Sequence, residues 1–183
     1  MATVGLRDVY TADVIEDANG LETFGAPKKL AKAISAKLEV ALAEGVLYAD
    51  DAVVEQISAF SSVKLTLETA DIASADMADL LGATLDATSN VVYSGKDDTP
   101  KYKAIGFRAK KADGQFRYIW LYKGKFSMPS EEFATKGEKV EFKTPTIEGT
   151  FQILNKNGMW KADLTALPTD KVALEWFTKV QEK

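Results

Sequence analysis

One stretch decides the fold class: Ile105-Gly106-Phe107-Arg108-Ala109-Lys110-Lys111-Ala112-Asp113-Gly114-Gln115-Phe116-Arg117-Tyr118-Ile119-Trp120-Leu121-Tyr122. Apolar and polar residues alternate over 105–110, and an aromatic-rich run fills 116–122. The Asp113-Gly114 pair between them tolerates positive φ at both turn positions, as a type I′ hairpin demands. The stretch therefore predicts two antiparallel strands joined by a tight turn.

The second strand of this hairpin is apolar on both faces. Tyr118, Trp120 and Tyr122 share one face, while Ile119 and Leu121 share the other. One face can pack in the core. The other must meet a helix or another subunit, because an exposed apolar strand is an aggregation hazard.

Alternation predicts strands on both sides of this hairpin. Leu30–Leu42 is apolar at every even position except Lys32, so a long half-buried strand is expected although Ala, Lys and Glu favour a helix. The residues from Val63 to Leu67 predict another strand, and residues 140–143 predict one that Pro145 ends. Residues 150–153 and 159–162 flank Asn157-Gly158 and predict a second hairpin.

Two helices complete the expected fold. Residues 71–81 carry an apolar stripe and are followed by Gly82 as a stop signal. The C-terminal segment 168–183 predicts a helix over 170–181, with Val172, Trp176 and Val180 on one face. The sequence thus predicts one mainly β domain over residues 1–183, a β-sandwich or barrel with one flanking helix and a C-terminal helix.

The segment from residue 44 to residue 62 admits two interpretations. It is long for a hairpin connection, yet it is rich in apolar residues. Val53, Ile57 and Phe60 have the spacing of a short helix over 52–60 that packs on its own core. The alternative is an arm that docks on a neighbouring molecule.

The composition excludes several kinds of catalytic and binding site. The 183 residues include no Cys and no His, which excludes disulfides, thiolate zinc sites and nucleophilic triads that need an imidazole. Lys and Arg number 23 against 27 Asp and Glu, so the net charge is −4 and a basic nucleic-acid-binding arm is not indicated. No stretch is long and apolar enough to span a bilayer, and the N-terminus does not resemble a secretory signal, so a cytoplasmic site of synthesis is expected.

The candidate sites for chemistry all have simpler explanations. Carboxylate pairs at 50–51, 97–98 and 131–132 are neighbours in sequence, which would place them on opposite faces of a strand or in solvated loops. Residues 94–96 hold only fragments of a phosphate loop. Trp120, Trp160 and Trp176 could form a sugar-binding platform, but core positions are favoured.

A basic cluster surrounds the first hairpin. Its members are Arg108, Lys110, Lys111, Arg117, Lys123 and Lys125. Aromatic residues interleave with them, as in some nucleic-acid-binding surfaces. The favoured interpretation is a charged edge that pairs with acidic loops of a partner. No catalytic, cofactor-binding or metal-binding residue is predicted.

The sequence resembles the major tail protein family of siphophages that infect Gram-positive bacteria. The blocks that carry the resemblance run nearly end to end: Val4–Tyr10, Asn19–Gly25, Leu30–Ile34, Leu47–Asp51, Asp79–Ala83, Gly106–Lys111, Arg117–Tyr122 and Thr144–Thr150. Each block alone is weak evidence for the resemblance, while the order and spacing of the blocks together are more specific to this family.

The resemblance implies a tail-tube fold, in which strands of six subunits complete one β-barrel and rings stack into a tube for genome delivery. It favours the arm interpretation of 44–62, with contacts between subunits or rings from Val46, Leu47, Tyr48, Val53, Val54, Ile57 and Phe60. Ser35, Lys37 and Glu39 are expected to face the lumen. The implied partners are further copies of the chain, a tape-measure protein, tail-tip and tail-terminator proteins and transiently passing DNA, with the virion tail as location.

Three other functions stay open at this point. A carbohydrate-binding β-sandwich predicts a monomer with exposed aromatic side chains. A carboxylate-based hydrolase predicts two distant carboxylates that converge in a pocket. A tail connector or completion protein predicts a single ring that does not stack.

Overall fold

The predicted hairpin lies at the centre of the sheet. In the computed structural model, which describes residues 3–49, 52–130 and 144–183, β8 (Lys103–Lys111) pairs with β9 (Phe116–Ser130). The turn differs from the predicted type I′. Only Gly114 has positive φ, 84°, and the Gln115 N–H bonds to the Asp113 carboxylate at 3.1 Å. The loop therefore has three residues with glycine in the left-handed position, another common hairpin connection.

The described strands form one large antiparallel sheet and a small ribbon. The large sheet has the order β2-β1-β8-β9-β10-β5-β4, while β11 also pairs with β9 and β3 with β1. The remaining strands are β1 (Thr3–Glu16), β2 (Glu22–Phe24), β3 (Lys28–Ala31), β4 (Ala33–Ala49), β5 (Ala52–Thr69), β10 (Thr146–Gln152), β11 (Lys161–Ala166) and the ribbon of β6 (Thr84–Asp86) with β7 (Val91–Tyr93). The prediction of a mainly β fold is confirmed.

The sheet curves around its main core. β3 pairs with β1, and Lys32 alone separates it from β4, the far end of the sheet. Alternate residues of β5, namely Val63, Leu65 and Leu67, are fully buried inside the curve, as their period of two predicts. Phe107, Ile119, Leu121, Phe126, Ile147 and Phe151 join this cluster from neighbouring strands.

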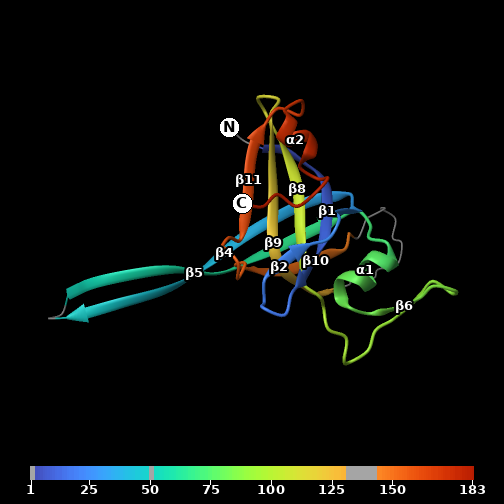
Figure 1. Ribbon diagram of the computed structural model, residues 1–183, viewed down its shortest axis with the longest axis horizontal. Coiled ribbons are helices and arrows are strands. Elements are labelled where there is room, and N and C mark those ends of the chain that lie inside the picture. Colours follow the sequence, from blue (N-terminus) through green and yellow to red (C-terminus); the bar gives the residue numbers. More distant parts are fainter. Residues whose placement is uncertain (1–2, 50–51, 131–143) are drawn as a thin grey trace, which may run out of the picture.

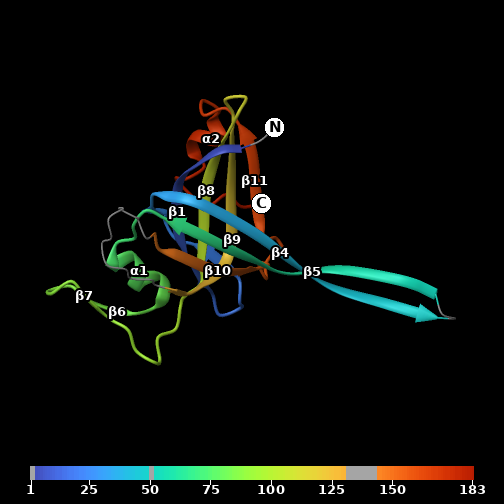
Figure 2. The same cartoon turned by 180° about the vertical axis from the view of Figure 1, so that it is seen from behind.

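A second core lies on the opposite face of β9. Phe116, Tyr118, Trp120 and Tyr122 are buried there. The C-terminal segment covers them, as Figures 1 and 2 show for α2 (Lys171–Glu175) beside β8 and β9. The Trp120 indole N–H donates to the Trp176 carbonyl at 3.0 Å, and the Tyr122 hydroxyl donates to the Gln181 carbonyl at 2.7 Å. The second face of β9 is therefore covered by its own chain.

The C-terminal helix is much shorter than predicted. Helix α2 ends at Glu175, and Val172 is 53% exposed, so the expected apolar stripe does not exist. Trp176 and Val180 are buried as expected. The Thr178 hydroxyl bonds to the Glu175 carbonyl at 2.7 Å, where the chain turns to bring both side chains onto the sheet. Packing against β9, rather than helix periodicity, sets the path of this segment.

Helix α1 (Ser74–Leu81) confirms the flanking helix, although it begins three residues later than predicted. Ala78 and Leu80 are buried, and Leu80 joins the main core. Gly82 ends the helix with φ of 75°, and its N–H bonds to the Ala78 carbonyl. This left-handed cap suits glycine, as the predicted stop signal requires.

The second predicted hairpin is wrong. The Asn157-Gly158 turn exists, with the Gly158 N–H bonded to the Leu154 carbonyl at 2.9 Å. The flanking strands do not pair with each other: β10 pairs with residues 123–130 of β9, and β11 pairs with residues 116–121. Because β9 has 15 residues, one edge of it holds two strands end to end. The strand predicted at 140–143 lies outside the described residues.

Strands β4 and β5 form a long hairpin, so the short helix over 52–60 is wrong. Their pairing runs from Ala33 opposite Thr69 out to Ala49 opposite Ala52. Figure 1 shows the outer part of this hairpin leaving the domain. Residues 44–62 therefore extend the two predicted strands into a projection.

Close packing at Gly106 gives a first prediction. Gly106 lies directly opposite Trp120 across β8 and β9, and a Cβ there would fall 2.7 Å from the buried indole ring. Gly106→Ala is expected to lower the free energy of unfolding by about 1–3 kcal/mol, because the indole cannot shift within a filled core. Urea unfolding measures the change. Gly5→Ala is the control, since a Cβ there meets nothing within 4 Å. Equal stability of the two variants would contradict the expected overlap.

Candidate assembly surface

The outer half of the β4–β5 hairpin projects from the domain as an arm, defined here as residues 42–60. Figures 1 and 2 show it standing clear of the rest of the described chain from both sides. At its base the register shifts between Ala41 and Leu42 and leaves Ser61 as an extra residue. Such a β-bulge bends a strand locally. The bulge therefore lies where the hairpin departs from the sheet.

The arm loses the burial that stabilises the inner hairpin. Val63 and Leu65 on β5 are fully buried, whereas Leu42 is 53% and Ile57 is 58% exposed. Two strands with no third strand or core behind them are only marginally stable in water. The arm thus presents apolar side chains and backbone edges that a partner could cover.

The predicted contact residues all lie on this hairpin. Its two strands hold Val46, Leu47, Tyr48, Val53, Val54, Ile57 and Phe60. Tyr48 and Val53 are opposite each other in the pairing, whereas Ile57 is opposite Gly45 and Phe60 is opposite Leu42. Ile57 is exposed, as expected of an unoccupied contact surface.

Phe60 has a partner within its own chain. Its ring stacks on Trp160 with centroids 5.3 Å apart and planes 17° apart. Trp160 lies in the loop between β10 and β11 and packs against the main core. This pair fixes the base of the arm to the domain. No local pattern predicts it, because the two residues lie 100 positions apart in the sequence.

Strand β4 is also the edge of the sheet, and among the described residues it pairs only with β5. The predicted lumen-facing residues Ser35, Lys37 and Glu39 are all exposed on it. Lys37 pairs with Glu39 at 2.7 Å, and the Ser35 hydroxyl donates to Glu68 at 3.0 Å. Charged side chains on an edge strand disfavour unspecific strand addition.

Three cations of the basic cluster have acidic partners within their own chain. Arg108 binds Asp8 at 2.6 Å, and the Arg117 Nε donates to Asp163 at 3.0 Å. Lys123 contacts Glu22 at 2.8 Å. Pairing of the cluster with acidic loops of another molecule stays a prediction.

The other candidate sites do not assemble. Trp120 and Trp176 are buried in the second core and Trp160 is stacked on Phe60, so the three form no common platform. The Asp98 carboxylate accepts the Gly95 N–H at 2.7 Å in a turn. The pairs at 50–51 and 131–132 lie outside the described residues. The described ranges contain no group of three or more acidic, Cys or His residues placed to hold a metal ion.

Two buried lysines were not foreseen from the sequence. Lys103 is 1% exposed and contacts Asp13 of β1 and Asp79 of α1, the latter at 2.6 Å. Lys123 is 3% exposed and contacts Glu16 and Glu22. Each ammonium therefore has two carboxylates, which offsets the cost of its burial. Lys103 ties the flanking helix to the sheet, and Lys123 ties β2 to β9.

One carboxylate in each cluster, Asp13 beside Lys103 and Glu22 beside Lys123, has a lowered pKa. The hydrogen bond from Lys103 lowers the pKa of Asp13. Burial raises the pKa of Glu22, but the Asn155 N–H and the Lys123 ammonium outweigh it, so this pKa also lies below its ordinary value. Unfolding would return both groups to ordinary values of 3.8 and 4.5. The two carboxylates therefore stabilise the folded state fully at pH values above their ordinary pKa values. This stabilisation is lost as the pH falls through their lowered pKa values in the folded protein.

Stability is accordingly expected to be nearly constant from neutral pH to about pH 5 and to fall steeply below about pH 4. Urea unfolding at a series of pH values measures this dependence. Glu22→Gln should be less stable at neutral pH, because Lys123 and two N–H groups lose their charged partner, and its stability should fall less steeply in acid. An unchanged slope for this variant would contradict the assignment.

The comparisons with known proteins add no relatives. No known family model matches the chain. No curated protein matches it at a significant level. Among the helices in the described ranges, none is long and apolar enough to cross a membrane. The family resemblance therefore stays a prediction, and the functional argument rests on the geometry of the arm and the sheet edge.

Proposed function

We propose that this protein is the structural subunit of a bacteriophage tail tube, in which six copies form a ring and rings stack into a channel for genome delivery. The observation that carries the proposal is the arm, residues 42–60. It extends two strands of the central sheet into solvent with Leu42 and Ile57 exposed. A structure of this kind gains stability when a partner covers it.

The sheet edge supports the same proposal. Strand β4 carries an unpaired edge over 17 residues among the described strands. A ring in which the strands of successive copies close into a barrel would remove such edges. In this arrangement the exposed polar face of β4, with Ser35, Lys37 and Glu39, lines a wet lumen. If the chain's net charge of −4 lies towards the lumen, DNA slides through without adhering.

Two of the blocks that carry the resemblance lie at the ends of described elements. Residues 47–49 are the last three of β4, and Asp79–Ala83 contains the end of α1 with its glycine cap. In the proposed tube the arm contacts the neighbouring subunit or ring. A tape-measure protein fills the channel during assembly, and tail-tip and tail-terminator proteins bound its two ends.

Negative-stain electron microscopy of the purified protein over a range of concentrations tests the proposal. Hollow tubes of stacked rings with six-fold symmetry are expected at high concentration. Single rings that never stack would favour a connector protein instead. A protein that stays monomeric at every concentration and binds glycans would count against a tube subunit and for a carbohydrate-binding module.

A further inference from the structure

An open pocket of about 370 Å³ lies where β1, β3, β4 and β8 meet. Five charged residues line it: Arg7, Asp8, Lys29, Lys32 and Arg108. Four are cations and one is an anion, so the pocket carries 4 − 1 = +3 in a chain whose net charge is −4. A concentration of positive charge against the sign of the whole chain favours an anionic ligand.

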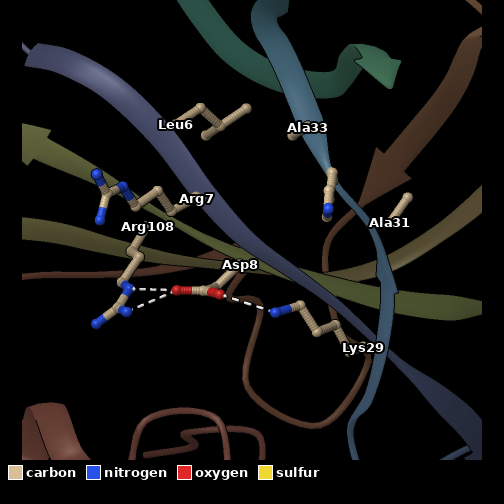
Figure 3. Close-up of a pocket in the computed structure, with 8 residues that line it drawn as sticks. Leu6, Arg7, Asp8, Lys29, Ala31, Ala33 and Arg108 are labelled. Atoms are coloured by element: carbon tan, nitrogen blue, oxygen red, sulfur yellow. Dashed lines mark hydrogen bonds and ion pairs between the residues drawn. The ribbon is translucent and has the colours of Figure 1, made fainter. Parts of the chain in front are cut away.

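The backbone builds this pocket around Asp8. Asp8 has φ of 53°, a conformation uncommon for residues other than glycine, and the β1–β8 register shifts between Arg7 and Tyr10. Figure 3 shows the result: the carboxylate points between Arg108, 2.6 Å away, and Lys29, 3.1 Å away. Partial burial raises the pKa of Asp8, but the hydrogen bonds from Lys29 and Arg108 outweigh this effect, so the pKa lies below its ordinary value. The ionised carboxylate holds both cations at the rim of the pocket.

Three of the four cationic side chains in the pocket are exposed to solvent. Lys29 has 58% of its side chain exposed, and Arg7 and Lys32 are exposed as well. Asp8 can neutralise only one of the four positive charges. The pocket can therefore bind further carboxylates without giving up the contacts that shape it.

The arm has the opposite charge. Between residues 41 and 63 the sequence holds four acidic residues, Glu44, Asp50, Asp51 and Glu55, and no Lys or Arg. This segment is thus −4 against the +3 of the pocket. The charges of the pocket and of the arm are therefore opposite in sign and similar in magnitude.

The arm cannot fill the pocket of its own chain. Ala33, at the start of β4, lines the pocket, while Ala49, at the end of the same strand, lies at the outer end of the arm. Sixteen steps of an extended strand span roughly 50 Å. The ligand must come from a second copy, and a contact between opposite ends of a subunit is heterologous, which produces rings or open filaments.

We propose that the Asp8 pocket is the receptor for the acidic arm of a second copy of the chain. The inference rests on the proposed self-assembly and adds the docking site and its chemistry. Ion pairing at an exposed site weakens with salt, so the contact should be strongest at low ionic strength.

Reversal of the charges on each side tests the pairing. Lys29→Glu/Lys32→Glu changes the charge of the pocket from +3 to −1, and Glu44→Lys/Asp50→Lys/Asp51→Lys/Glu55→Lys changes that of residues 41–63 from −4 to +4. Each variant alone should fail to assemble in sedimentation velocity, because its arm and its pocket carry charge of the same sign. An equimolar mixture of the two should assemble, since each arm then meets a pocket of opposite sign. A mixture that stays dispersed, or single variants that assemble as the wild type does, would overturn the proposal.

Lys171→Glu/Lys179→Glu is the matched control for Lys29→Glu/Lys32→Glu, because it makes the same change in net charge at two exposed positions of the C-terminal segment. It should assemble normally. A synthetic peptide of residues 42–60 separates this inference from the proposed function. The peptide should bind the folded protein in a salt-dependent way, and Lys29→Glu/Lys32→Glu should weaken it by about tenfold or more.

The outcomes are distinct. If deletion of the arm abolishes assembly while Lys29→Glu/Lys32→Glu assembles normally and does not weaken the peptide, the protein self-assembles and the pocket is not the receptor. Lack of peptide binding at low salt would overturn the inference directly. Binding of a single-stranded oligonucleotide that Lys29→Glu/Lys32→Glu abolishes, with assembly unchanged, would assign the pocket to nucleic acid instead.

Discussion

Replacement of residues 46–56 by an Asn-Gly turn is expected to leave a folded domain that no longer self-associates. Gly45 and Ile57 are directly opposite each other, so a two-residue turn can close the hairpin at this point without a change of register. Among the arm residues whose side chains the structure describes, only Phe60 packs against a core, and the replacement retains it. The free energy of unfolding should therefore change by less than about 1 kcal/mol, whereas assembly should be lost.

Sedimentation velocity and electron microscopy measure assembly, and urea unfolding measures stability. A second exposed hairpin provides the control: residues 87–90, between β6 and β7, can be replaced by the same turn. That variant should assemble as the wild type does. Tubes formed by the variant without the arm tip would exclude the arm as the assembly element.

Trp176→Ala is expected to lower the free energy of unfolding by about 3–5 kcal/mol, the usual range for removal of a large buried aromatic side chain. Trp176 is 4% exposed, and its ring lies 5.9 Å from that of Tyr118. Its loss leaves a cavity and loosens the cover over the aromatic face of β9. The exposed face should also promote aggregation on heating.

Val172→Ala is the informative control for this variant. Sequence periodicity places Val172 on the same buried stripe as Trp176, whereas the structure leaves it 53% exposed. Its substitution should change stability by no more than about 0.5 kcal/mol. Equal losses from both substitutions would favour the continuous helix over the observed short one.

The features that the sequence predicts correctly depend on local patterns. The central hairpin and the strand through Val63 follow from a period of two and a turn pair, which act over a few residues. The prediction of the second hairpin failed because the Asn157-Gly158 turn specifies a chain reversal but not the strands with which the flanking strands pair. Strand β9 is long enough for both β10 and β11 to pair along one of its edges.

The candidate site was predictable in part for the same reason. Apolar content marked residues 44–62 as unusual, but composition fitted a packed helix as well as an arm, and only the strand pairing separates them. The burial of Lys103 and Lys123 could not be predicted from the sequence, because their carboxylate partners come from strands or a helix distant in sequence. The Asp8 pocket likewise depends on a bulge that joins β1, β3 and β8.

The pairing of β1 with β8 has a consequence for the order in which the chain folds during synthesis. Arg7 lies opposite Arg108, so the first strand has no neighbour in β8 until about a hundred further residues have left the ribosome. Hairpins with short connections, such as β4–β5, need no such wait. The projecting arm can thus form on a nascent chain whose N-terminal strand still lacks its neighbour β8. A subunit made on crowded polysomes would then expose the apolar side chains of this arm before its domain is complete.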